Sequence, residues 1–121
     1  METIEHNGQK VYTQCTRWIT KRDLKKAKVE LGIIKDAYFF QVGPEREVEM
    51  IDFDRQKIER GQSGLFVEVK TGGSQACVSI IGLERITSFL DEMGSSRNLF
   101  RLPGRVVDAY YSGMMLLGIG V

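Results

Sequence analysis

The side chains that most often carry out catalysis are scarce in this sequence. It contains one histidine, His6, and two cysteines, Cys15 and Cys77. General acid–base catalysis usually recruits a histidine, and a cysteine nucleophile needs a base that a further group orients. Both cysteines lie in strand-like segments, where we expect burial, and the three residues are fewer than the four ligands of structural zinc. We therefore predict no enzyme, with no catalytic residue, no metal and no cofactor.

Acidic residues gather in the stretch EREVEMIDFDRQKIE, residues 45–59. Paired carboxylates can hold a divalent metal or divide acid and base roles between them. Here basic residues are interleaved with the acids, which is typical of a solvated strand edge that resists aggregation. The glycines of KTGGSQ, residues 70–75, lack the Gly-Lys-Ser/Thr ending of a phosphate-binding loop. We interpret them as a hairpin turn.

Basic side chains are concentrated between residues 17 and 28, where Asp23 is the one acid. Lysine and arginine neutralise phosphates, and an exposed tryptophan beside them can stack on a base. A second, acid-free group of arginines lies near residue 100. We expect these residues to contact single-stranded DNA or RNA: Arg17, Trp18, Lys21, Arg22, Lys25, Lys26, Lys28, Arg97, Arg101 and Arg105. Further stacking could come from Tyr12, Tyr38 and Phe39 if the sheet face is exposed.

Three alternatives to nucleic-acid binding remain open. The formal net charge is +1, whereas dedicated nucleic-acid binders are usually more basic, so the lysines could simply solvate one helix face. The same helix could dock on an acidic protein surface, as in a small homo-oligomeric adaptor or inhibitor. Arg97, Arg101 or Arg105 could instead hold a phosphorylated small molecule between subunits.

The basic residues would be positioned by a strand over residues 10–19 and a helix over 21–31. Thr20 and Asp23 imitate a capping box, and Gly32 stands where a helix would end. The helical period puts Leu24, Ala27 and Leu31 on one buried stripe, with the cations on the opposite side.

Two hairpins and a second helix are expected next. Residues 37–53 pair best across a loop of three or five residues, because both lengths place apolar side chains opposite one another. A turn centred on Gly72 and Gly73 would give one wholly apolar face. Its expected pairs are Leu65 with Ile80, Val67 with Val78, and Val69 with Ala76. Residues 83–93 have the apolar spacing of a surface helix that ends at Gly94.

The last expected element is a helix over residues 103–117, beginning with Pro103 in its first turn. Apolar side chains surround this helix on nearly every side, so it needs cover on two faces. Either it fills the core of its own chain, or a second copy supplies one cover. For the second case, we predict a stripe that lies in an oligomer interface: Ala109, Ser112, Gly113 and Leu116.

These elements predict one α+β domain over residues 1–121, with residues 1–9 flexible. It would contain a predominantly antiparallel sheet of about five strands and two to three helices. The 121 residues are 42% hydrophobic and 27% charged, as in globular proteins. No secretory signal and no apolar run of bilayer length are visible, so we expect a cytoplasmic protein without a membrane partner.

Overall fold

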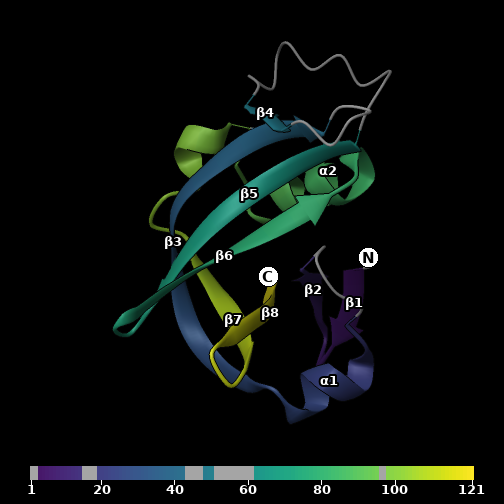
Figure 1. Cartoon of the computed structure of the whole chain (residues 1–121), viewed down its shortest axis with the longest axis vertical. Helices are drawn as coiled ribbons and strands as arrows, with labels where there is room; N and C mark the ends of the chain where they lie inside the picture. The colour runs from purple at the N-terminus through teal and green to yellow at the C-terminus, as the bar shows by residue number, and fades with distance from the viewer. Residues whose placement is uncertain (1–2, 15–18, 43–47, 51–61, 96–97) are drawn as a thin grey trace.

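The computed structural model describes residues 3–14, 19–42, 48–50, 62–95 and 98–121. Its strands form one sheet in the order β1-β2-β8-β7-β3-β5-β6, with β4 paired to β3, and every pairing is antiparallel (Figure 1). The elements are β1 (Thr3–His6), β2 (Gln9–Thr13), α1 (Lys21–Lys26), β3 (Lys28–Val42), β4 (Val48–Met50), β5 (Gln62–Thr71), β6 (Ser74–Ile81), α2 (Leu83–Glu92), the 3-10 helix η2 (Leu99–Arg101), β7 (Val106–Ser112) and β8 (Met115–Gly120).

The sheet-rich architecture with helices confirms the predicted antiparallel sheet, but five strands is too few. Eight strands are present among the described residues. Neither described α-helix is long and apolar enough to cross a bilayer.

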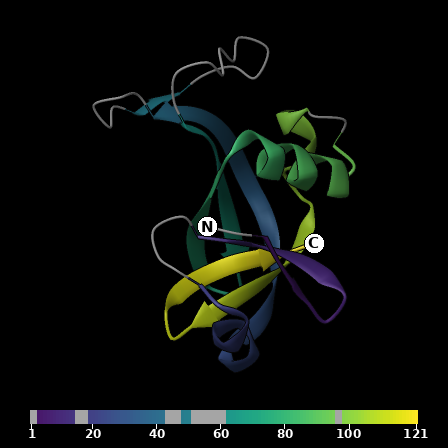
Figure 2. The same ribbon diagram turned by 90° about the vertical axis from the view of Figure 1, so that its right-hand side faces the viewer.

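The sheet curls until β6, at one end of the strand order, approaches β2 and β8 near the other end (Figure 2). A side chain bridges the remaining gap. Just after β2, the amide nitrogen of Gln14 donates to the Cys77 carbonyl, and its oxygen accepts from the Ser79 N–H at 3.1 Å. Because both partners are backbone groups of β6, the amide takes the place that a strand would occupy.

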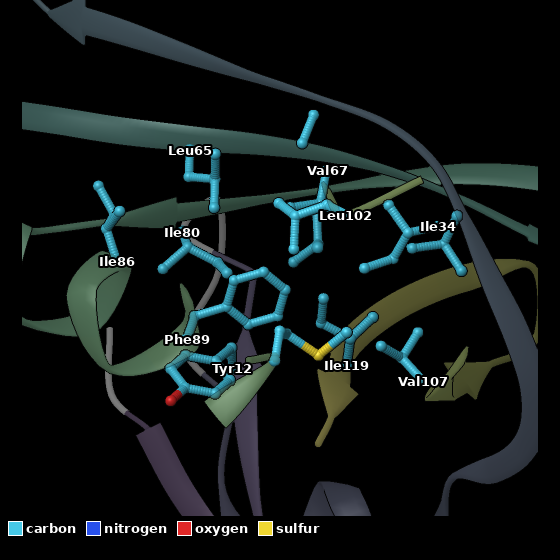
Figure 3. Close-up of a cluster of buried hydrophobic side chains, with 14 of the residues drawn as sticks. Tyr12, Ile34, Leu65, Val67, Ile80, Ile86, Phe89, Leu102, Val107 and Ile119 are labelled. Atoms are coloured by element: carbon cyan, nitrogen blue, oxygen red, sulfur yellow. The ribbon is translucent and has the colours of Figure 1, made fainter. Parts of the chain in front are cut away.

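The main core fills the concave side of the curled sheet (Figure 3). Helix α2 lies across this side and contributes Ile86, Phe89 and Leu90, all fully buried. The ring of Phe89 meets Tyr12 edge to face, with ring centroids 5.2 Å apart. The rest of the cluster comes from β2, β3, β5, β6, β7 and β8, together with Met93 after α2 and Leu102 after η2.

A second, smaller cluster lies on the outer side of the sheet beneath α1. Leu24 of α1 and the preceding Ile19 cover side chains of four strands. These strand residues are Ile4, Val11, Tyr110 and Leu117. The C-terminal strands are therefore covered by the main core on one side and, at Tyr110 and Leu117, by the cluster beneath α1 on the other.

This double cover explains why the predicted C-terminal helix is wrong. Residues 103–117 form a turn and most of the β7–β8 hairpin, which reverses at Gly113 with φ +61°. Much of its apolar character follows from this arrangement, because Val107, Tyr111 and Leu116 enter the main core while Tyr110 and Leu117 enter the outer cluster. Ala109 and Leu116 lie in the chain's own core, while Ser112 and Gly113 are at the exposed turn. The proposed oligomer stripe therefore does not exist as a surface.

The basic helix is also shorter than expected. It ends at Lys26, and residues 28–31 belong to strand β3. The β-branched Val29, Ile33 and Ile34 favour an extended chain. Pairing of β3 with β7 and β5 then supplies the backbone hydrogen-bond partners that an extended segment needs. Gly32 is not a helix cap. It lies in β3 where a Cβ atom would come within 2.6 Å of a Val69 methyl group.

The described part of the segment predicted to be flexible, residues 3–9, belongs to a hairpin. Strands β1 and β2 pair across Asn7 and Gly8, whose φ angles of +51° and +78° suit a tight hairpin turn. Of the strand predicted over 10–19, residues up to Thr13 are confirmed, and 15–18 lie outside the described residues.

The two central hairpins follow the predicted registers. All three apolar pairs of β5 and β6 are present, and Gly72 takes a left-handed φ of +52° in the turn between the strands. Strand β4 pairs Val48 with Val42 and Met50 with Phe40, the register of a five-residue loop. Helix α2 is confirmed and is followed by Gly94.

Candidate binding surface

Helix α1 begins with a complete capping box. The Thr20 hydroxyl accepts from the Asp23 N–H at 3.3 Å, and the Asp23 carboxylate accepts from the Thr20 N–H at 2.8 Å. These bonds satisfy two backbone donors that a helix start leaves unpaired. Leu24, 1% exposed, anchors the helix to the outer cluster. A helix of six residues is thus held in place by one cap and one buried side chain.

The cationic side chains of α1 are exposed to solvent. We call them the α1 cations: Lys21, Arg22, Lys25 and Lys26. No ion pair between described residues involves any of the four. Lys28 differs, because it lies in β3 and pairs with Glu30 at 3.1 Å. The predicted row of helical cations is therefore reduced to four residues.

The β7–β8 turn lies at the same end of the molecule as α1 (Figures 1 and 2). Lys28 is in register with Tyr111, so the turn that follows Tyr111 projects beside the end of α1. At its tip, Met114 is 97% exposed. An apolar side chain thus accompanies the cations at this end.

A row of exposed aliphatic side chains continues from α1 along the outer face of β3. Val29, Leu31 and Ile33 alternate along the strand and are 48%, 68% and 50% exposed. Val106 of β7, in register with Ile33, is 54% exposed. Val29 is in register with Tyr110, which α1 covers, so this β3 row (Val29, Leu31, Ile33 and Val106) adjoins the helix. Contiguous exposed apolar residues, unlike isolated ones, mark interaction surfaces.

Cations also border the far end of the β3 row. Lys70 of β5 is in register with Ile33, and the exposed Arg105 precedes Val106. Lys35 is exposed nearby, with its ammonium group 3.4 Å from the Gln75 side-chain oxygen. Asp108, beside Leu31, is an acid along the row, and its carboxylate accepts from the Gln9 amide at 3.1 Å.

Among the other predicted nucleic-acid contacts that the structure describes, Arg101 and Arg105 do not join the α1 cations in one track. Arg17, Trp18 and Arg97 lie outside the described residues. Arg101 belongs to η2, in the half of the molecule away from α1 (Figure 1), and its carbonyl accepts from the Arg105 side chain at 3.3 Å. The β3 row lies between α1 and the pair Arg101 and Arg105.

The predicted stacking aromatics are mostly buried. Tyr12 and Phe39 are 0% and 2% exposed, so neither can stack on a base. Tyr38 is exposed, but its hydroxyl donates to the Asp36 carboxylate, which raises the pKa of Tyr38 to about 12. The described residues therefore offer aliphatic rather than aromatic contact beside the cations.

Of the residues considered for catalysis, His6 and Cys77 are described and lie in different strands, β1 and β6. His6 lies in β1 with its ring edge-on to Tyr110, at a centroid distance of 5.6 Å. Burial raises the pKa of the Cys77 thiol, and the nearby Glu68 acts in the same direction. Cys15 and most of the acidic stretch 45–59 are outside the described residues. Within the described ranges, no three His, Cys, Asp or Glu side chains form a group suited to a metal.

The helical period predicted over residues 21–31 places Leu31 on the buried side, so the β3 row is not among the predicted site residues. The available signal was the alternation in VELGI, which puts Val29, Leu31 and Ile33 on one face of a strand.

Comparison of the chain with protein-family models, curated proteins and solved structures finds no match.

Proposed function

We propose that this protein is a non-enzymatic binding module, an adaptor or inhibitor, that docks on an acidic surface of a partner protein. The α1 cations and the β3 row form the docking surface. The observation that carries the proposal is the exposed aliphatic row directly beside cations that have no ion pair among the described residues. Aliphatic side chains gain little from phosphates but are buried favourably in a protein interface.

The test is a charge reversal on α1. The double variant Lys21→Glu/Lys25→Glu should keep its fold, because Leu24 is the buried residue of the helix. Wild type, this variant and Arg101→Glu, a charge control in η2, serve as bait in nuclease-treated lysate. We expect a protein retained by wild type and by Arg101→Glu but lost with the α1 variant. The retained partner, once purified, should then bind wild type and Arg101→Glu more tightly than it binds the α1 variant. Equal retention by all three baits would contradict the proposal.

Single-stranded nucleic acid is the second candidate, favoured by the clustering of four exposed cations on α1. Four neutralised phosphates predict a logarithmic salt slope of about −2.8 for a single strand. Affinity for a fluorescent 20-nucleotide oligothymidine would then fall about 50-fold between 50 and 200 mM salt. Such binding, abolished by Lys21→Glu/Lys25→Glu, would favour nucleic acid over an acidic protein.

A further inference from the structure

We infer that the β3 row receives an acidic amphipathic helix of the partner, an inference that rests on the proposed function and specifies its ligand. The first argument is the unfinished outer layer of the fold. An apolar sheet face is normally buried against another layer. Here α1 covers the outer face over Val11, Tyr110 and Leu117, but this cover stops beside Val29. A helix on the β3 row would continue the layer that α1 begins.

The second argument is length. Val29 and Ile33 are separated by four residue steps, which span roughly 13 Å at about 3.3 Å per residue in a strand. A helix rises about 1.5 Å per residue, so roughly nine residues cover the same length. Such a helix presents apolar side chains at positions i, i+4 and i+7 or i+8 on one side. Three apolar side chains would then meet the three β3 members of the row.

The third argument is charge. The row has Lys25 and Lys26 of α1 toward one end and Lys70 and Arg105 at the other. Asp108, along the row, already accepts a hydrogen bond from Gln9. Carboxylates flanking the apolar stripe of the incoming helix would therefore face cations at both ends. A basic helix would meet repulsion there, so the surface selects an acidic one.

The probe is a fluorescein-labelled 18-residue helical peptide, with leucines at i, i+4, i+7 and i+11 and with alanine and glutamate elsewhere. Two control peptides keep its length. One scatters the leucines around the helix, and the other replaces every glutamate by lysine. Anisotropy titrations use wild type, Leu31→Asp, Phe100→Asp and the double variant Lys21→Glu/Lys25→Glu. Phe100 is 93% exposed and lies in η2, outside the row, so its variant carries the same kind of change.

We expect the striped acidic peptide to bind wild type more tightly than either control peptide does. Leu31→Asp should weaken this binding about 30-fold or more, the effect of losing a central interface anchor. Phe100→Asp should leave it unchanged. Leu31 is 68% exposed, so its variant should fold, and circular dichroism checks this.

Other outcomes separate this inference from the proposed function. If the scattered acidic peptide binds equally well and only Lys21→Glu/Lys25→Glu abolishes binding, the inference fails and the proposed function stands. If no acidic peptide binds, the inference fails, and the retention experiment decides the proposed function separately. A concentration-dependent dimer that Leu31→Asp disrupts in sedimentation would mean that a second copy occupies the row, which also overturns the inference.

Discussion

The bridge that Gln14 makes to β6 can be tested by one nearly isosteric change, Gln14→Glu. The native amide donates to the Cys77 carbonyl and accepts from the Ser79 N–H. A protonated glutamic acid can reproduce both bonds, because its hydroxyl donates and its carbonyl accepts. An ionised glutamate is acceptor-only, so one of its oxygens would face the Cys77 carbonyl without a proton between them. The folded state of the variant therefore favours the protonated form.

The sign of the pH effect follows from this preference. In the Gln14→Glu variant, the pKa of the introduced carboxyl should be raised above its unfolded value of about 4.3 by the carbonyl it must donate to. Its stabilising contribution is then fully present below about pH 4.3 and is lost as pH rises through the raised folded-state pKa. At pH 7 the variant loses one hydrogen bond and gains an unfavourable contact, which costs about 1–3 kcal/mol. Gln14 is half-buried, so the lower part of this range is expected.

The assay is urea unfolding of wild type, Gln14→Glu and Gln14→Leu at pH 4 and pH 7. The difference from wild type removes the titration of all other groups. We expect Gln14→Glu to be close to wild type at pH 4 and about 1–2 kcal/mol less stable at pH 7. Gln14→Leu should be destabilised similarly at both pH values. A Gln14→Glu penalty that is absent at pH 7, or that does not change with pH, would refute the role of this side chain in closing the sheet.

Three further predictions concern the core, the helix start and one tyrosine. Gly32→Ala puts a Cβ atom 2.6 Å from a methyl of the buried Val69, so urea unfolding should show a loss of about 1–3 kcal/mol. Gly73→Ala, with nothing within 4 Å, should change stability by less than about 0.5 kcal/mol. Thr20→Ala removes the capping acceptor of α1, and hydrogen exchange of the α1 amides should report about 1 kcal/mol less protection; unchanged protection would contradict the cap. The difference in tyrosinate absorbance between wild type and Tyr38→Phe isolates the titration of Tyr38. Its midpoint should lie near pH 12, and a midpoint near pH 10 would contradict the hydrogen bond to the Asp36 carboxylate.

Local patterns predicted the elements whose partners are close in sequence. The β5–β6 register follows from apolar residues two apart on either side of a two-residue turn, and α2 follows from its spacing of apolar residues. Thr20 and Asp23 likewise identified the start of α1, because a capping box is complete within four residues. Asn7 and Gly8 are an equally local signal, because Asn-Gly favours the tight turn that joins β1 and β2.

The candidate surface was only partly predictable. The α1 cations follow from composition and the helix start, since four basic residues fall within the six of the helix. The β3 row does not, because a short run such as Lys28–Leu31 fits a helical or an extended period, and pairing with β7 decides between them. Leu31 faces solvent only in the extended form.

By itself, the sequence determined an antiparallel, sheet-rich chain, the pairings of its central hairpins and a compact group of cations after residue 20. Tertiary structure alone decided that residues 106–120 form a strand hairpin, because a largely apolar segment suits both a buried helix and a strand pair packed on two faces. A helix and a strand pair of this sequence differ in which other elements must cover their two faces. In this chain the core and α1 supply that cover for Tyr111 and Tyr110, while nothing among the described residues covers Leu31 to the same extent. Local periodicity specifies which side chains share a face, but only long-range packing specifies which face meets water.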